Sequence, residues 1–426
     1  MLIFGPNLLL QFLFIALILL FHTTFSQETN ISDSISTLAT NRSAVSEEKN
    51  TNCSGADLIN NKDKNHKIKN GLTNREIFFE KGRSSFKFKY SGRIQTRFDL
   101  TKAQGPGIES EKDLYFRRVR FKSDGHLFNP KFGYKLEIDL IGAQVLDAYV
   151  KWNFYRNFEI WAGQTKLRGN RERVISSQEL QFVDRSLLNA KFTLDRDIGV
   201  WLMHQFNAGH GTFRQVLSVS KGEGLAIWQE NPAPIEKGLD YTARLEYLPF
   251  GDFIGKGDYK GSDLEREPTP KLALGLTFDY NNNAVKSRGQ TGSVTDNKAN
   301  IRSWISDLMF KYMGFSFMSE YVDRKIHNYR EQTTAQYNDF VNDFYTGKAF
   351  NAQSGYVFGN NYEIAGRYTE VCPQQGSPFP DLTQYTIAFS KFIVGHKIKV
   401  QTDFSWLQEE SKPTTHIYRF QFELSL

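Results

Sequence analysis

The stretch Phe86-Lys-Phe-Lys-Tyr-Ser-Gly-Arg-Ile-Gln-Thr-Arg-Phe-Asp-Leu100 decides the fold class, because its side chains alternate between two kinds. One set is almost entirely apolar: Phe86, Phe88, Tyr90, Gly92, Ile94, Thr96, Phe98 and Leu100. The other set is polar: Lys87, Lys89, Ser91, Arg93, Gln95, Arg97 and Asp99. A period of two places successive side chains on opposite faces of a β-strand. The stretch therefore predicts a strand with one apolar and one polar face.

The same alternation recurs to the end of the chain, at residues 132–140, 146–154, 398–406 and 418–426. Segments of about 10 residues match a tilted strand that crosses a bilayer. Strands of a soluble sandwich are shorter, about 5–6 residues, and a soluble barrel places its apolar side chains inside. The pattern therefore predicts an all-β fold, a transmembrane antiparallel β-barrel whose polar face lines the interior.

Sixteen strands are predicted, and an even number is expected of a bacterial barrel. They lie at 86–100, 114–123, 131–141, 145–154, 157–165, 198–207, 212–220, 239–249, 271–280, 303–312, 315–323, 350–357, 361–370, 382–393, 396–407 and 415–426. One end of the barrel would carry short turns and the other end long loops, the asymmetry between the periplasmic and outer sides of such barrels. The long loops expected are 101–113, 166–197, 221–238, 281–302 and 324–349. Residues 250–270 break the rule, as a long connection on the short-turn side.

Composition limits the alternatives. Hydrophobic residues make up 40% of the 426 residues, and the mean hydropathy is below zero, which excludes a bundle of membrane helices. Aromatic residues reach 14%, which fits a lipid-facing barrel with rings at both interfaces. Composition alone leaves a soluble all-β protein open. We expect four tryptophans at the membrane interfaces: Trp152, Trp201, Trp304 and Trp406.

The N-terminal region divides into two segments ahead of the barrel domain, residues 86–426. The apolar run Leu8–Phe21, followed by small and polar residues, predicts a signal peptide at residues 1–26. No Lys or Arg precedes the run, so an uncleaved anchor is the alternative. Residues 27–85 form a leader of low complexity, and its part up to residue 75 is expected to be disordered. The chain is therefore expected to be exported to the bacterial outer membrane.

Charge and reactive residues give little support for catalysis. The formal net charge is +6, a mild excess that suggests a preference for anions and does not indicate a nucleic-acid partner. Cys53 and Cys372 are too few for a disulfide scaffold or a metal site, and the sequence does not decide whether they pair. The eight histidines have no metal-ligand spacing, and no loop resembles a phosphate-cradling motif. We therefore expect no cofactor, no metal and no enzymatic activity.

The connection from Lys166 to Asp197 is the strongest candidate for a functional segment. It carries seven Lys/Arg and five Asp/Glu, and it follows the fifth strand, from where it can fold inward and narrow the lumen. A solvated surface loop is the alternative reading of the same charges. The segment also contains two adjacent serines, Ser176 and Ser177, with no histidine close in sequence to act as a base.

At this point the chain resembles a known family, the phosphate-selective porins O and P, from about Phe86 to Leu426. The resemblance is carried by Phe116-Arg-Arg-Val-Arg120, Leu136-Glu-Ile-Asp139, Leu146-Asp-Ala-Tyr-Val150, Gly163-Gln-Thr-Lys166, Ser176-Ser177 and Phe182-Val-Asp-Arg-Ser186. It implies a sixteen-stranded barrel, usually a homotrimer, with an arginine ladder and a constricting loop that binds phosphate. The family's loop motif matches Arg173, Ser176, Ser177 and Arg185, with Lys more usual at the first of these positions.

The resulting candidate residues form two groups. The predicted anion-binding constriction contains Lys166, Arg168, Arg171, Arg173, Ser176, Ser177 and Arg185. The predicted basic wall of the pore contains Lys87, Lys89, Arg93, Arg97, Arg118, Arg120 and Lys122. A basic wall in a low-dielectric lumen concentrates anions, and guanidinium groups pair with phosphate oxygens through forked hydrogen bonds.

The charge of the whole lumen is nearly balanced, because neighbouring strands point Glu137, Asp139, Asp147 and Glu159 inward. We therefore predict passive diffusion of small hydrophilic anions, with phosphate or polyphosphate as the solute that the resemblance implies. An unselective porin of the same fold is the first alternative. A barrel enzyme or adhesin of the outer membrane is the second, and a secreted soluble β-protein is the third.

Overall fold

The computed structural model describes residues 69–73, 76–81, 84–105, 107, 109–225, 238–327 and 340–425. The predicted signal peptide and all of the predicted leader before residue 69 lie outside the described residues, as does Cys53. Cys372 is a free, half-buried thiol in strand β15. No helix among these described segments is long and apolar enough to cross a membrane.

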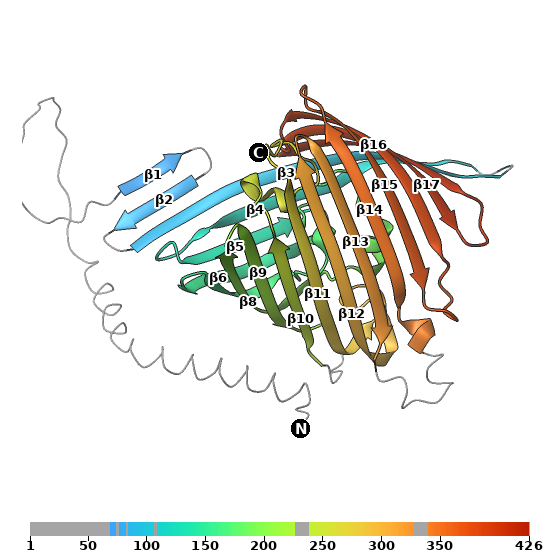
Figure 1. Cartoon of the computed structure of the whole chain (residues 1–426), viewed down its shortest axis with the longest axis horizontal. Helices are drawn as coiled ribbons and strands as arrows, with labels where there is room; N and C mark the ends of the chain where they lie inside the picture. The colour runs from blue at the N-terminus through green and yellow to red at the C-terminus, as the bar shows by residue number, and fades with distance from the viewer. Residues whose placement is uncertain are drawn as a thin grey trace, which may run out of the picture. The chain divides into compact units, whose positions relative to one another are not determined.

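Sixteen antiparallel strands form a closed β-barrel (Figure 1). Each strand from β3 onward pairs with the next, and β18 pairs back with β3, which closes the ring. The bounds are β3 Ser84–Ala103, β4 Glu111–His126, β5 Phe132–Asp139, β6 Gln144–Tyr155, β7 Phe158–Lys166, β8 Arg196–Ala208, β9 Gly211–Ser220, β10 Asp240–Leu248, β11 Lys271–Lys286, β12 Val294–Tyr312, β13 Phe315–Ile326, β14 Gly347–Val357, β15 Tyr362–Pro373, β16 Leu382–Val394, β17 Ile398–Glu409 and β18 Thr415–Ser425. All sixteen predicted strands are confirmed.

The main difference from the predicted strands lies at the ends of β11 and β12. The prediction of a loop over residues 281–302 was wrong, because it is too long. The two strands continue into this range and leave only the turn 287–293 between them. Ala284 still pairs with Ala299 and Lys286 with Val294, across two bulges. This extension carries polar residues on both faces, so no apolar alternation marks it in the sequence.

A hairpin missed by the sequence analysis lies within the predicted leader. It consists of β1, Lys69–Thr73, and β2, Glu76–Lys81. Strand β2 pairs with the first residues of β3, along the same edge that β18 occupies from Arg93 onward. The hairpin thus continues the sheet beyond the C-terminal end of β18.

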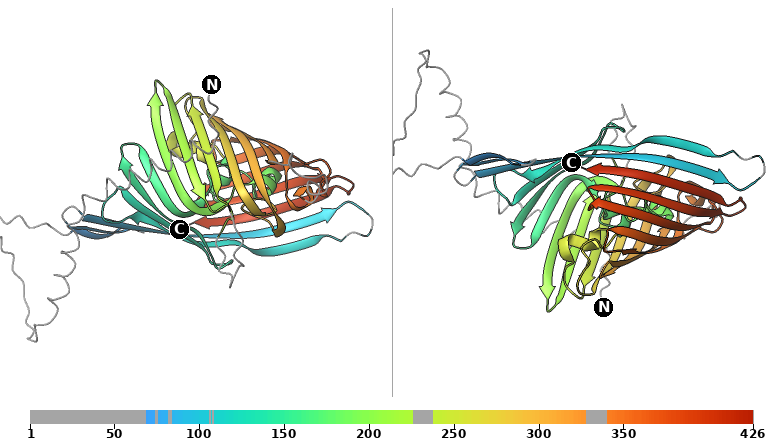
Figure 2. Two further views of the ribbon diagram at one scale, coloured as in Figure 1. Left: turned by 90° about the horizontal axis from the view of Figure 1, so that it is seen from below. Right: turned by 90° about the horizontal axis from the view of Figure 1, so that it is seen from above.

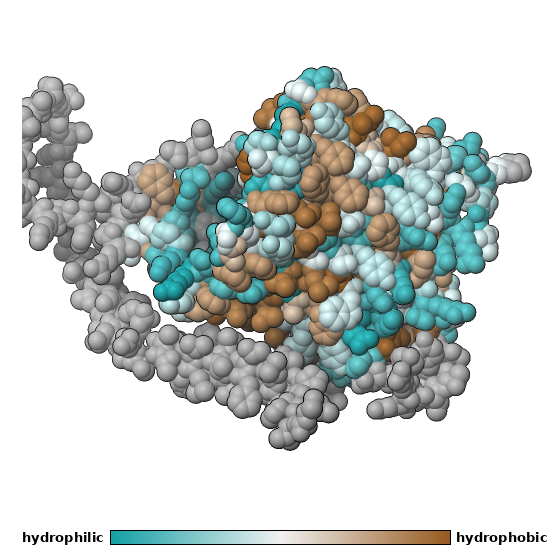
Figure 3. All heavy atoms as spheres, viewed as in Figure 1, coloured by the Kyte–Doolittle hydropathy of each residue, from teal (hydrophilic) through white to brown (hydrophobic). Residues whose placement is uncertain are grey.

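The outer face of the barrel is apolar, as a lipid-facing wall requires. Hydrophobic residues gather over the middle of the face in Figure 3, with hydrophilic residues toward its edges. Near the short-turn end, Phe158, His204, Phe206, Phe213 and Tyr247 stack in a row across β7 to β10, with ring centroids 3.9–5.6 Å apart. Such a row of rings is typical of a membrane interface.

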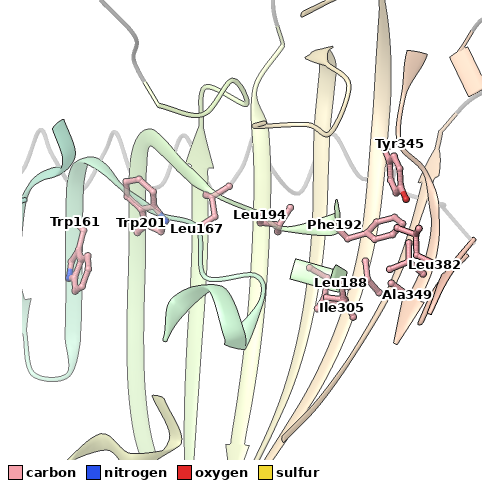
Figure 4. Close-up of a cluster of buried hydrophobic side chains, with 12 residues drawn as sticks. Trp161, Leu167, Leu188, Phe192, Leu194, Trp201, Ile305, Tyr345, Ala349 and Leu382 are labelled. Atoms are coloured by element: carbon pink, nitrogen blue, oxygen red, sulfur yellow. The ribbon is translucent and has the colours of Figure 1, made fainter. Parts of the chain in front are cut away.

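The predicted interfacial tryptophans divide into two groups. Trp152 and Trp304 are exposed on the outer face, and Trp406 is half-buried there. The prediction for Trp201 was wrong, because its side chain is 0% exposed and packs in a cluster inside the barrel. Its neighbours there include Leu167 and Leu194, which belong to the long connection between β7 and β8 (Figure 4).

That connection, residues 167–195, is called the inner loop here, because it folds into the ring of strands (Figure 2). It contains two short helices, α3 Arg171–Val174 and α4 Leu187–Phe192. Its apolar side chains pack against inward residues of the wall, as Leu188 and Phe192 do near Ile305 of β12 and Ala349 of β14. Burial of this apolar face holds the loop inside a lumen that is otherwise polar.

The long connection on the short-turn side, residues 249–270, also folds inward and is called the inner turn here. It contains the 3₁₀ segment η1, Ile254–Tyr259. Phe253 packs with Ile175 and Leu180 of the inner loop and with Met309 and Met318 of the wall. The Gly261 N–H donates to the Glu179 carbonyl oxygen at 2.8 Å. The exception noted in the sequence is therefore a second internal segment, bound to the first.

Candidate functional site

The first turn of the inner loop is fixed to the wall by a buried ion network around Arg171. The Arg171 guanidinium lies 2.5 Å from the Asp307 carboxylate, 3.3 Å from Glu246 and 3.8 Å from Asp258 of the inner turn. Arg244 of β10 pairs with both Asp307 and Glu246 at 2.6 and 2.8 Å. Every charged group in this network has an opposite partner, so the network joins the inner loop, the inner turn and two strands.

The middle of the inner loop is fixed by neutral and charge-assisted hydrogen bonds. The Arg93 guanidinium donates to the Ser177 hydroxyl at 2.9 Å. The Gln181 side-chain amide donates to the Ser316 hydroxyl at 2.9 Å and to the Glu363 carboxylate at 2.8 Å. These contacts reach β3, β13 and β15, so the loop spans the lumen.

Asp184, further along the inner loop, lies among guanidinium groups of the wall. Its carboxylate is 2.9 Å from Arg97 and 3.7 Å from Arg117. The Arg367 guanidinium donates to the Asp184 carbonyl oxygen at 2.8 Å. Burial alone would raise the pKa of Asp184, but Arg97, Arg117 and Arg118 outweigh it and hold that pKa well below its usual range. Asp184 is therefore a fixed negative charge among arginines.

A cavity of about 210 Å³ opens beside Asp184. It is lined by inner-loop residues and by two residues of the turn 287–293: Arg173, Asp184, Arg185, Asn189, Ala190, Thr193, Asp195, Arg288 and Thr291. The cavity is large enough for several waters or for a small hydrated ion.

Two of the arginines lining the cavity have no carboxylate partner among the described residues. Arg185 donates to the carbonyl oxygens of Glu172 at 3.1 Å and Ile175 at 2.8 Å. Arg288 donates to the Ala190 carbonyl oxygen at 2.8 Å. Arg173, in contrast, is paired with Asp195. The cavity thus has an excess of positive charge, and it comes from Arg185 and Arg288.

The charge of Arg185 persists at neutral pH. Burial, together with the neighbouring Arg173, lowers the pKa of Arg185 to about 9. That value is still well above 7, so the guanidinium remains protonated.

Two neutral side chains of the cavity carry polar atoms with no hydrogen-bond partner among the described residues. These atoms are the Asn189 side-chain amide nitrogen and the Thr193 hydroxyl oxygen, and both are buried. A buried donor without a partner is costly unless a ligand or water satisfies it. Together with the unpaired arginines, these donors suit a small oxyanion.

The structure separates the predicted constriction residues. It brings Arg173 and Arg185 together at the cavity, and it places Ser177 on Arg93. The Lys166 ammonium donates to the Arg173 carbonyl oxygen at 2.7 Å, and the Ser176 hydroxyl accepts from the Gln178 N–H at 3.3 Å. Arg168 lies over the Trp161 ring, 5.3 Å from its centroid. Arg171 belongs to the ion network and does not line the cavity.

The predicted basic wall also divides in two. Arg93, Arg97 and Arg118 are buried beside the inner loop. Arg120 is 3.0 Å from Glu137 and 3.5 Å from Asp139, so acidic residues of β5 offset its charge.

The three lysines of the same set lie toward the short-turn end, away from the cavity. Lys87 pairs with Glu76 of β2 at 2.8 Å, and Lys122 with Asp124 at 3.1 Å. Lys89 is exposed and stands opposite Glu76 in the β2–β3 pairing. These lysines lie on the same side of their strands as Arg93 and Arg120, as predicted. They stand beside acidic residues of the sheet and not beside the inner loop.

Four contributors to the site were missed from the sequence: Asp184, Asn189, Thr193 and Arg288. Asp184 lies next to Arg185 in the segment Phe182–Ser186, which carries part of the family resemblance. That segment could therefore have indicated Asp184 as a site residue. Arg288 lies between Lys286 and Gly289 in a turn that was read as part of a longer loop. Nothing in its spacing indicates that this turn folds toward the inner loop.

Comparison with known proteins identifies the family of the chain. The family model of phosphate-selective porin O and P matches residues 88–370, about two thirds of the chain. The chain belongs to that family, and it is a porin of the bacterial outer membrane. An uncharacterized protein of Aquifex aeolicus (strain VF5) is 24% identical over 382 residues, which cover 78% of this chain and 86% of that protein.

Solved structures similar to the chain include outer-membrane proteins and an anion-selective porin, at low sequence identity. OmpTdeltaL8, a loop L8 deletion mutant of the Vibrio cholerae outer membrane protein OmpT, has a TM-score of 0.51 at 10% identity and covers 80% of this chain and 99% of its own. Pseudomonas putida OprB has a TM-score of 0.51 at 8% identity, covering 79% and 94%. The anion-selective porin from Comamonas acidovorans has a TM-score of 0.50 at 10% identity, covering 80% and 99%. These similarities establish the barrel fold.

Proposed function

We propose that this porin conducts small hydrophilic anions and that phosphate binds transiently in the cavity between the inner loop and the turn 287–293. The observation that carries the proposal is the pair of arginines, Arg185 and Arg288, which line the cavity without a carboxylate partner among the described residues. Guanidinium groups bind phosphate oxygens through strong, charge-assisted hydrogen bonds. The unpartnered donors of Asn189 and Thr193 supply neutral contacts that replace lost water.

The wall arginines would deliver anions to this cavity. Arg93, Arg97, Arg117 and Arg118 lie on β3 and β4 beside the inner loop. Positive charge along a narrow path with low-dielectric walls raises the local concentration of anions. Asp184 offsets part of that charge, which favours release of the anion as well as its capture.

An unselective porin is the alternative, because acidic residues of β5 and β6 balance the lumen elsewhere. Planar-bilayer recordings in a KCl gradient distinguish the two. We expect a reversal potential that indicates anion preference, and a chloride current that falls as phosphate is added. Cation preference, or a chloride current that phosphate leaves unchanged, would refute the phosphate proposal. A barrel enzyme would instead show ester hydrolysis without channel conductance.

We propose a homotrimer as the assembly, as the family resemblance implies. Strand β5 pairs with β4 only from Arg120 onward, so residues 111–118 of β4 have no strand partner on that side among the described residues. Leu114 and Phe116 on this segment are 71% and 60% exposed. A neighbouring copy would cover them. Chemical cross-linking in mild detergent should give a trimeric band, and a monomer alone would contradict this proposal.

The signal peptide at residues 1–26 and the leader that follows it remain part of the proposal. N-terminal sequencing of the protein extracted from outer membranes would locate the cleavage. We expect a new N-terminus near Gln27, and an N-terminus at Met1 would favour the uncleaved anchor.

A further inference from the structure

A block of oxygen-bearing side chains lies on the inner faces of β9, β10 and β11. In the strand pairing, Asp240 stands opposite Ser220 on one side and Asn281 on the other. Thr242 stands opposite Ser218 and Asp279 in the same way. All six side chains are buried: Ser218, Ser220, Asp240, Thr242, Asp279 and Asn281. The block lies outside the anion cavity and contains no basic residue.

The two carboxylates of this block form no direct ion pair, although the buried Arg324 of β13 is near enough to attract both. Asp240 and Asp279 are 0% and 1% exposed, and their carboxyl groups lie within hydrogen-bonding reach of each other. Neither forms an ion pair with any Lys, Arg or His that the structure describes. The nearby Arg324 donates its guanidinium hydrogens to Ser303 and to the carbonyl oxygens of Arg288 and Phe192 instead.

Some buried acids of this barrel form ion pairs, whereas Glu320 and Glu363 are buried without one and accept hydrogen bonds from neutral amides. Asp307 and Glu246 each lie against an arginine, at 2.5 and 2.8 Å. Two buried carboxylates without a cation are very costly, so a proton or a bound cation must neutralise them.

Unpartnered oxygens next to the pair favour a bound cation. One oxygen of Asp240, the Ser218 hydroxyl and the side-chain carbonyl of Gln290 are all buried without a hydrogen-bond partner among the described residues. Gln290 comes from the turn 287–293, and its amide nitrogen donates to the other oxygen of Asp240. A shared proton would satisfy the carboxylates alone. It would leave the hydroxyl and amide oxygens to buried water, whereas a hard cation can use them as ligands together with the carboxylates.

We propose that Asp240 and Asp279, with neutral oxygens of Ser218, Thr242 and Gln290, bind a divalent cation, Ca²⁺ in the first place. Calcium accepts six to eight oxygen ligands in irregular geometry, including carboxylates, carbonyl groups and water. Asp197 is a neighbour and not a ligand, because its carboxylate accepts the N–H groups of Ile198 and Gly222.

The described residues hold no set of three His, Cys, Asp or Glu side chains arranged around a metal. The site therefore relies on two carboxylates, and we expect a dissociation constant on the order of 0.1–1 mM.

The bound cation would hold the turn 287–293 against the strands, because Gln290 belongs to that turn. The site does not depend on the proposed anion selectivity, since none of its ligands lines the anion cavity. Its failure and the failure of the anion proposal are therefore distinguishable.

The test uses the full-length protein in detergent, stripped of metal with EDTA. Calcium is then titrated by calorimetry, and the melting midpoint is followed by circular dichroism. For the wild type we expect one bound Ca²⁺ per chain and a midpoint raised by roughly 5 °C in millimolar Ca²⁺. Asp240→Asn should lose both effects. Asp296→Asn, which removes the same charge from an exposed residue of β12, should keep both effects.

Three results would overturn the inference: no calcium binding by the wild type, an equal rise of the midpoint in Asp240→Asn, or loss of the rise in Asp296→Asn as well. If a shared proton neutralises the pair instead, the melting midpoint should fall as the pH rises from 5 to 8, and calcium should not change it. If Asp240→Asn does not fold, Gln290→Ala serves in its place, because it removes a neutral ligand from an outer turn and should weaken calcium binding about tenfold. Phosphate block of the wild type, recorded before the metal is stripped, tests the anion proposal separately.

Discussion

Arg171 and Arg185 lie on the same inner loop, and their surroundings differ completely. Arg171 is buried against three carboxylates that belong to the wall and to the inner turn. Arg185 binds only carbonyl oxygens of its own loop, and it faces a cavity. In the first arrangement, the charge of Arg171 is neutralised by ion pairs that hold the loop in place. The second leaves the charge available, so only Arg185 is suited to bind an anion that passes.

Removal of Arg171 should have the largest effect on the barrel. Arg171→Ala leaves Asp307 and Glu246 buried with one partner fewer, and losing one side of a buried pair typically costs about 3–5 kcal/mol. We expect a lower unfolding midpoint in urea and a larger, noisier single-channel conductance, because the loop loses its anchor. Arg168→Ala is the control, since its contact is with aromatic rings and should change stability by about 1 kcal/mol or less. Equal stability of Arg171→Ala and wild type would contradict the assignment of Arg171 as an anchor.

Removal of the two arginines without a carboxylate partner should weaken anion binding and leave the fold intact. Arg185→Ala and Arg288→Ala should each weaken phosphate block of the chloride current about tenfold or more, since a charge-assisted hydrogen bond contributes about 1.5–3 kcal/mol. Arg266→Ala is the matched control, because Arg266 also donates to a carbonyl oxygen, that of Phe358, but lies on the inner turn away from the cavity. If Arg266→Ala weakens the block as much as the other two variants, the cavity is not the binding site.

Substitution of Asp184 should change phosphate block by a smaller factor and in the opposite direction. Asp184→Asn releases Arg97 and Arg117 from their shared carboxylate, so phosphate should bind a few times more tightly and block chloride at lower concentration. Weaker block in this variant would mean that Asp184 holds the arginines in a binding geometry and does not compete with the anion.

The pH dependence of that variant follows from the lowered pKa of Asp184. A carboxylate with a lowered pKa keeps its stabilising charge above the ordinary value of about 3.9 and loses it only as the pH falls through the lowered value. The difference in anion preference between wild type and Asp184→Asn, measured as the reversal potential in a KCl gradient, should therefore stay constant from pH 8 to pH 5, because chloride does not titrate in this range. A difference that vanishes by pH 5 would show that Asp184 is protonated there.

Lys87 should have the smallest effect. It was predicted as part of the basic wall, but it pairs with Glu76 of β2 on the extension of the sheet. Lys87→Ala should change phosphate block less than about twofold, because exposed ion pairs contribute little. A change as large as that of Arg288→Ala would place the lysine on the path of the anion.

The sequence predicted the wall well, and it predicted the interior less completely. Strict alternation is imposed on each strand by lipid on one side and water on the other, so segments such as 398–406 are recognisable without any partner. Residues inside the barrel are under no such rule. Trp201 looks like an interfacial ring in sequence, but it faces inward because Leu167 and Leu194 of the inner loop cover it.

The candidate site shows the same limit. Arg173 and Arg185 were reached through the family resemblance, which covers the inner loop. Arg288 is more than 100 positions away, and it reaches the cavity only because β11 and β12 carry its turn over the inner loop. Which arginines remain unpaired is decided by such contacts between distant segments, and the sequence alone gives their charges without their partners.

The most direct test of the central claim is to locate the anion. Crystals of the protein soaked in arsenate, an analogue of phosphate with an anomalous signal, should show a peak in the cavity within hydrogen-bonding distance of Arg185 and Arg288. The peak should weaken or disappear in Arg185→Ala. An arsenate peak on the wall away from this cavity, or the same peak in Arg185→Ala, would contradict the account.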